Sequence, residues 1–245
     1  QVIKCEDKNS LSLLKKKVFE QAKKVFNYNP KNIDDGLDNF HKYLKNLKDT
    51  ELNEKKVKLI KKISTNKILV NLLFKSFEQT IKDLIGNDIL VQKTINLVIQ
   101  PPKDNNPTIP HRDAPPNSFY EVVVWIPLTN CYETKSMYVV NANKSKECIN
   151  ILKKDDKNWG KLIKVIQKNK IYPRVNYGEA LFFMTNIYHG SDTNITNETR
   201  FSLNIRFKNL FTPSGKKFPL HFFRPYQISE FTKYAIERSK EENEN

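Results

Sequence analysis

The sequence predicts an α+β fold in which a double-stranded β-helix, or jelly roll, is covered by an N-terminal layer of helices. Two observations lead to this prediction. Apolar residues recur at helical spacing through residues 8–93, and from residue 94 onward the spacing becomes two. Helices followed by many short strands are typical of an antiparallel β architecture with helices packed on one side. Two facing sheets would also leave a mouth in which a site can form.

The chain is expected to divide into three segments. Residues 1–93 form the helical layer, residues 94–225 form the jelly-roll core with a lysine-rich insertion at 141–170, and residues 226–245 form a closing helix and a polar tail. A length of 245 residues suits one such core with its covering layer. The sequence contains no internal repeat, no P-loop and no glycine pattern for dinucleotide binding.

The first segment reads as four amphipathic helices. The first runs from residue 8 to a break at Asn29-Pro30, because proline ends a helix. The others are expected over residues 33–47, 52–63 and 66–84, with Gly86 near the end of the last.

The second segment reads as strands. They are expected over Thr94–Gln100, Glu121–Pro127 and Ser136–Val140, and, after one short helix around Trp159–Gln167, from Ile171 through Glu179–Met184 and Arg200–Phe207. Residues Gln227–Arg238 read as the closing helix.

The strand Arg200–Phe207 alternates strictly between polar and apolar residues. Arg200, Ser202, Asn204 and Arg206 fall on one face, and the other face is wholly apolar. If the polar face points inward, it lines a cavity that holds an anion. The planar fork of Arg200 suits a carboxylate better than a lysine would.

Three residues form a candidate metal site. His111 and Asp113 point the same way on extended chain, so both can bind one ion. His189 follows the apolar strand at Glu179–Met184. Two histidines and one carboxylate make up the facial triad of non-haem Fe(II) oxygenases.

This arrangement resembles the signature of the 2-oxoglutarate/Fe(II)-dependent oxygenases: His-x-Asp, a distant His, ten residues, then Arg-x-Ser. The likeness is strongest to the group found sporadically in bacterial carbohydrate-biosynthesis clusters, which is related to streptomycin-biosynthesis oxygenases and phytanoyl-CoA dioxygenases. It runs from about residue 30 to about residue 225. The stretches that carry it are 92–101, 121–128, 131–138, 199–208 and 211–213.

The resemblance implies a cupin-like core and an oxidoreductase of the dioxygenase type. Fe(II) would be held by the catalytic set His111, Asp113 and His189, and O2 and 2-oxoglutarate would be consumed to give succinate, carbon dioxide and an oxidised substrate. Arg200 and Ser202 would hold the distal carboxylate of 2-oxoglutarate. The remaining candidates for its binding are Asn204 and Asn96, of which Asn96 serves equally well in a hydrogen bond at the end of a strand ladder.

The loop Ala114–Ser118 departs from the pattern of that group because it is shorter and richer in proline. It borders the metal ligands, so substrate choice is expected to differ. The substrate class implied is a small molecule, namely a sugar, a nucleotide-sugar or a surface-glycan precursor, which can carry phosphate.

Five residues are candidate substrate contacts, and each has a second interpretation. Arg112 would line an outer rim and Lys135 a strand mouth, or both are solvated surface charges. Glu121 contacts substrate or is solvated, and Trp125 contacts substrate or belongs to the core. Arg206 holds a further anionic group or pairs with a buried carboxylate.

The net charge is +15, from 42 basic and 27 acidic residues. Such a charge can indicate nucleic acid or an acidic small substrate. The lysines are scattered, so nucleic acid is not the partner we favour. The alternatives are a nucleic-acid or protein oxygenase and a non-catalytic jelly-roll binding module, and the complete triad argues against the module.

The location expected for this protein is the cytoplasm. No apolar run is long enough to span a bilayer, and the first residues show no signal-peptide pattern. Cys5, Cys131 and Cys148 lack metal-binding spacing, and we expect reduced thiols. The oligomeric state is left open.

Overall fold

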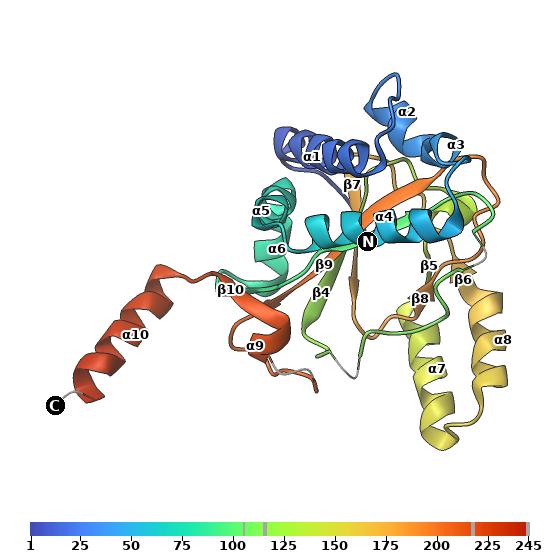
Figure 1. Cartoon of the computed structure of the whole chain (residues 1–245). Helices are drawn as coiled ribbons and strands as arrows, with labels where there is room; N and C mark the ends of the chain where they lie inside the picture. The colour runs from blue at the N-terminus through green and yellow to red at the C-terminus, as the bar shows by residue number, and fades with distance from the viewer. Residues whose placement is uncertain (105, 115–116, 217–218, 244–245) are drawn as a thin grey trace.

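The computed structural model describes residues 1–104, 106–114, 117–216 and 219–243. It contains a seven-stranded and a three-stranded antiparallel sheet with helices on both flanks (Figure 1). The α+β prediction is therefore confirmed. Within these ranges, no helix combines the length and apolar character needed to cross a membrane.

The N-terminal helices form a layer over one face of the large sheet (Figure 1). Capping explains where two of them begin: the Asp7 carboxylate accepts two main-chain N–H groups at the start of the first, and the Asn66 side chain does so for the fifth. The helices are α1 (Lys8–Phe26), α2 (Ile33–Asp38), α3 (Phe40–Tyr43), α4 (Asp49–Ser64), α5 (Lys67–Ser76) and α6 (Glu78–Ile85).

The large sheet is built around one long strand, β9 (Arg200–Asn209). It pairs with β4 (Glu121–Pro127) on one side, and with β3 (Asn96–Gln100) and then β2 (Ile89–Gln92) on the other. The order is β1-β7-β4-β9-β2-β10, with β3 also paired to β9. The outer strands are β1 (Val2–Lys4), β7 (Glu179–Met184) and β10 (Phe223–Gln227).

The two faces of β9 differ as its alternation predicts. Phe201, Leu203, Ile205 and Phe207 are completely buried, and they join the core formed with the helical layer. Burial of such side chains contributes about 1.5–3 kcal/mol each. The polar residues of β9 therefore point to the opposite face, away from the helices.

The small sheet carries a helical hairpin on its outside. Its order is β6 (Lys170–Ile171), β5 (Tyr138–Val140) and β8 (His189–Gly190). The hairpin consists of α7 (Ala142–Lys154) and α8 (Trp159–Asn169), and its apolar side packs on Tyr138 and Tyr188. The helix predicted around Trp159–Gln167 is present as α8, and the insertion also contains α7, which was not predicted and begins at the Asn141 cap.

Two predicted boundaries also need correction. The range 1–93 was expected to be helical, but it contains β1 and β2. Strand β2 is extended because it pairs with β9 and β10 on its two edges. At the other end, β10 precedes the closing helix α10 (Glu230–Asn243), which projects from the body (Figure 1). The remaining short helices are η1 (Glu133–Lys135) and α9 (Pro219–Phe222).

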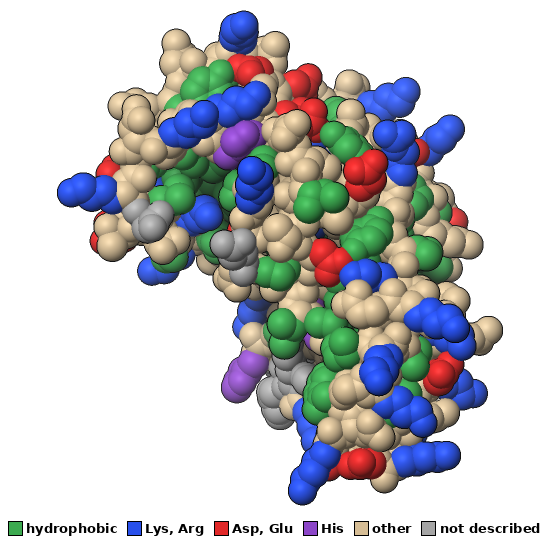
Figure 2. Space-filling model, turned by 90° about the vertical axis from the view of Figure 1, so that its right-hand side faces the viewer, with side chains coloured by type: hydrophobic (Ala, Val, Ile, Leu, Met, Phe, Trp, Pro, Cys, Tyr) green, Lys and Arg blue, Asp and Glu red, His purple; other side chains and the backbone are tan. Residues whose placement is uncertain are grey.

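Basic side chains are spread over the visible face in Figure 2, with acidic side chains between them. They do not gather there into one continuous patch. This distribution is the one expected for scattered lysines.

Candidate metal centre

Two segments far apart in the sequence lie side by side at the candidate site. The N–H of His111 donates to the carbonyl of His189 at 3.0 Å, and the N–H of His189 donates back at 2.9 Å. Two residues away, the N–H of Ser191 donates to the carbonyl of Thr108, whose own N–H donates to Ser191 Oγ. The main chain itself therefore holds the two histidines together.

The same kind of hydrogen bond orients each of the two histidine rings. Nδ1 of His111 lies 2.9 Å from the Ile109 carbonyl oxygen, and Nδ1 of His189 lies 2.9 Å from the Ile187 carbonyl oxygen. A carbonyl can only accept, so each Nδ1 carries a proton, and in a neutral ring Nε2 is then the nitrogen with a lone pair. The ring centroids are 4.2 Å apart. The tautomer with its proton on Nδ1 leaves Nε2 able to bind a metal.

Asp113 completes the set. One ligand atom each of His111, Asp113 and His189 lies within 4.8 Å of the others. Burial lowers the pKa of His189 to about 4, so the ring is neutral near pH 7. Burial acts to raise the pKa of Asp113, but the adjacent Arg206 and the two histidines outweigh it, and the net shift is downward. Both states, neutral imidazole and ionised carboxylate, suit metal binding.

Arg206 pairs with a buried carboxylate, which was one of its two predicted roles. Its Nη2 lies 2.6 Å from Asp113 Oδ2 and its Nε lies 3.1 Å from the same oxygen. Its Nη1 donates to Gln92 Oε1 at 3.0 Å. The guanidinium therefore adjoins the candidate metal site.

Arg200 is in a different position, because it has no carboxylate partner among the described residues. Its side chain is 3% exposed, and its Nη1 donates to the Lys135 carbonyl at 3.4 Å. Its Nε is buried without a partner in those residues, as is the Oγ of Ser202. Burial lowers the pKa of Arg200, yet a guanidinium stays charged at neutral pH. An anion bound here would compensate the buried charge of Arg200 and accept a hydrogen bond from the Ser202 hydroxyl.

One cavity of about 290 Å³ connects the triad with Arg200. The face of β9 contributes Arg200, Asn204 and Arg206, and β3 contributes Asn96. Asn96 Nδ2 donates to Asn204 Oδ1 at 2.8 Å across the strand pair. Trp125 is buried, which agrees with its interpretation as a core residue, and it also lines the cavity.

Lys135 is neither a solvated surface charge nor one of the residues that line the triad cavity. Its side chain is 0% exposed, and its ammonium lies 2.7 Å from both Asp38 and Glu198. These partners come from α2 and from the loop before β9. Two carboxylates therefore compensate the buried charge, and none of it is presented to the cavity.

Glu121 is also not solvated, because only 2% of it is exposed. Its Oε1 accepts the N–H of Ser118 at 2.7 Å, and burial raises its pKa. It does not line the cavity that holds the triad. Its role as a substrate contact there is not supported.

Arg112 is half-buried and hydrogen-bonds the Tyr188 side chain. It is not among the residues that line the triad cavity. In the loop Ala114–Ser118, residues 115–116 lie outside the described residues. The first loop residue is held in place by a main-chain hydrogen bond, since Ala114 N–H donates to the Thr185 carbonyl.

Sequence reasoning missed several residues of the site. Thr108, Met137 and Ser191 line the cavity. Gly190 is required there, because a Cβ would lie 2.3 Å from the Tyr138 hydroxyl oxygen. The position of Ser191 directly after His189-Gly190 was an available signal, whereas Met137 gave none.

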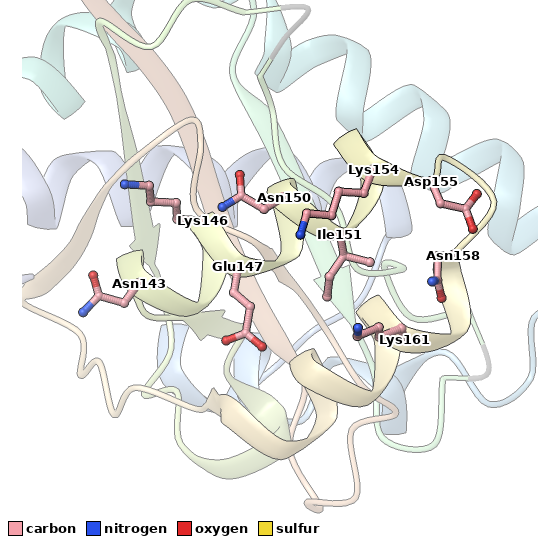
Figure 3. A pocket seen from close by; sticks show the side chains of 9 residues that line it. All are labelled: Asn143, Lys146, Glu147, Asn150, Ile151, Lys154, Asp155, Asn158 and Lys161. Carbon is pink, nitrogen blue, oxygen red and sulfur yellow. The ribbon is translucent and has the colours of Figure 1, made fainter.

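A larger hollow of about 410 Å³ lies on the α7–α8 hairpin (Figure 3). Its walls carry Lys146, Lys154 and Lys161 together with Glu147 and Asp155. None of the triad residues lines it, so it is separate from the candidate metal centre.

No protein-family model and no curated protein matches the chain. Among solved structures it is similar to the nickel complex of the non-heme monooxygenase ThoJ (18% identity, TM-score 0.47, covering 74% of this chain and 77% of that one). It is also similar to SnoK, a non-heme alpha-ketoglutarate-dependent carbocyclase from nogalamycin biosynthesis (16% identity, TM-score 0.46, 67% and 68%). A third is AviO1 from Streptomyces viridochromogenes Tue57 (18% identity, TM-score 0.46, 59% and 62%).

Likeness at these identities and TM-scores assigns no activity to this chain. The chemistry open to this chain therefore depends on its own residues. What they form is a His–Asp–His set and a buried guanidinium without a carboxylate partner in the described residues, both lining one cavity.

Proposed function

We propose that this protein is a 2-oxoglutarate- and Fe(II)-dependent oxygenase. The observation that carries the proposal is that the triad and the buried Arg200 line the same small cavity. A dicarboxylic co-substrate must reach a metal with one end and a cation with the other, and this cavity offers both.

The donor set fits Fe(II). His111 and His189 would each supply Nε2, and Asp113 would supply a carboxylate oxygen, which leaves open positions on the ion. When bound, the iron and 2-oxoglutarate together supply the oxidising chemistry, with O2 as the oxidant. The chain's own residues hold, orient and desolvate what binds there.

The free donors fit the distal carboxylate of 2-oxoglutarate. Arg200 offers a planar fork, and Ser202 adds a hydroxyl whose oxygen has no partner within the described part of the chain. Asn96 and Asn204 lie farther along the same wall and can contact the co-substrate chain. Trp125 and Met137 provide an apolar side that excludes water.

We further propose that the substrate is a sugar, a nucleotide-sugar or a surface-glycan precursor. Support comes from the likeness of residues 92–101, 121–128 and 199–208 to oxygenases of carbohydrate clusters. Arg112 remains the candidate contact for a phosphate group, since Lys135 is buried in ion pairs.

The test is Fe(II)-dependent release of succinate from 2-oxoglutarate, measured with panels of sugars, nucleotide-sugars and oligonucleotides. His189→Ala should abolish it, and His221→Ala, on an exposed histidine outside the triad, should not. Arg200→Lys should raise the 2-oxoglutarate concentration needed by about tenfold, equivalent to about 1.4 kcal/mol.

The outcomes separate the two levels of the proposal. Succinate release that does not depend on iron or on His189 contradicts the oxygenase assignment. Release stimulated only by oligonucleotides leaves the oxygenase assignment standing and removes the sugar substrate.

A further inference from the structure

The contact between Arg206 and Asp113 is asymmetric. Nη2 and Nε both approach the same carboxylate oxygen, Oδ2, at 2.6 and 3.1 Å. Two N–H donors from a rigid fork on one oxygen fix the rotation of the carboxylate about its last bond. Oδ1 is the oxygen that these two contacts leave for another partner.

Arg206 is itself held on two further sides. Its Nη1 donates to Oε1 of Gln92, a residue that is 2% exposed at the end of β2. The ring of Phe222, from α9, lies with its centroid 5.7 Å from the guanidinium carbon. The fork therefore cannot swing away from Asp113 without breaking contacts to two other elements.

Burial makes this ion pair strong. The side chains of Arg206 and Asp113 are 8% and 10% exposed, so water screens their attraction weakly. A lysine at the same place offers one point charge and cannot supply two donors to Oδ2 and a third to Gln92.

We propose that Arg206 is a positioning residue that presents Asp113 to the metal through Oδ1 alone. The inference rests on the proposed function, because it takes His111, Asp113 and His189 as the metal ligands. Ligation through one oxygen keeps the carboxylate from occupying a second coordination position. That position would then be open for one oxygen of the co-substrate or for O2.

A Co(II) titration of the full, metal-free chain tests this without any turnover. Co(II) absorbs in the visible, and both affinity and band shape report its ligand geometry. Arg206→Lys should weaken Co(II) binding about 10–100-fold, the usual cost of losing a partner of a metal ligand, and should alter the spectrum. Gln92→Met removes the acceptor that orients the guanidinium of Arg206. It should change the Co(II) affinity and the spectrum in the same direction as Arg206→Lys, but by less.

Arg200→Lys is the matched control, since it makes the same exchange on the same strand face. Without 2-oxoglutarate it should leave Co(II) affinity and spectrum unchanged. If Arg206→Lys does not fold, judged by circular dichroism, Gln92→Met carries the test alone.

The outcomes distinguish the two claims. In the first outcome the wild type binds Co(II), and Arg206→Lys, or Gln92→Met in its place, binds it equally well or more tightly with the same spectrum. This result overturns the role of Arg206 only. A wild type that binds no Co(II) overturns the proposed function and this inference with it.

Discussion

Arg200 and Arg206 share a strand and a face, yet their surroundings are opposite. Arg206 lies against the carboxylate of Asp113, whereas Arg200 hydrogen-bonds the Lys135 carbonyl and has no carboxylate partner among the residues that the structure describes. Both are at least nine-tenths buried. We expect a buried guanidinium that is paired within the protein to matter for the fold, and one that lacks such a partner to serve the proposed ligand. Substitution at the two positions should therefore have opposite effects on stability.

Arg206→Met should produce the largest loss of stability. It leaves Asp113 buried without its cation, and breaking such a pair costs about 3–5 kcal/mol. Chemical denaturation of the metal-free chain measures it. A loss below about 0.5 kcal/mol, the range of ordinary surface substitutions, would mean that Asp113 finds another partner.

Lys135→Met should come next, with a loss of about 2 kcal/mol, because its two carboxylate partners are partly exposed and water compensates part of the loss. Its main-chain carbonyl also accepts a hydrogen bond from Arg200, so a shift of this segment after the ion pairs are lost should weaken 2-oxoglutarate binding as well. Lys144→Met, which removes an exposed pair with Glu147, is the control. Equal stability of the two variants would argue against a structural role for Lys135.

Arg200→Met should change stability in the other direction. The metal-free chain should gain about 1 kcal/mol, because a buried charge without its anion no longer has to be desolvated. The same variant should lose the stabilisation that 2-oxoglutarate with Mn(II) gives the wild type, measured as a shift in melting temperature. If Arg200→Met is less stable than the wild type and is still stabilised normally by 2-oxoglutarate, then Arg200 and Arg206 both have structural roles.

Ser202→Ala should have the smallest effect. Its hydroxyl has no partner within the described residues, so stability should change by less than about 0.5 kcal/mol. The 2-oxoglutarate affinity should fall about fivefold, the value of one hydrogen bond of about 1 kcal/mol. Isothermal titration detects this difference, and an unchanged affinity would exclude Ser202 from the co-substrate pocket.

The comparison also explains which features the sequence could predict. The inward face of β9 follows from strict alternation, and the spacing of His111 and Asp113 follows from the period of extended chain. Both are local rules. The proximity of His189 to them came from a resemblance of motifs, and the structure brings the three together.

The errors concern contacts between distant parts of the chain. Lys135 was assigned to a rim because nothing near it in the sequence indicates that Asp38, on α2, reaches it. The partner of Arg206 was left open for the same reason, since Asp113 lies on another segment. Strand β2 was read as part of the helical layer, because a short apolar run does not distinguish a buried strand from a buried helix end.

The mutual main-chain bonds of His111 and His189 have a consequence for how the proposed metal would be acquired. The two candidate ligands meet through peptide groups, so their approach does not depend on the ion. The chain can then fold before it binds metal, and metal binding becomes the association of a divalent ion with a preformed site. Which metal a preparation contains would accordingly reflect the ions supplied during growth and purification, and exchange should proceed without unfolding.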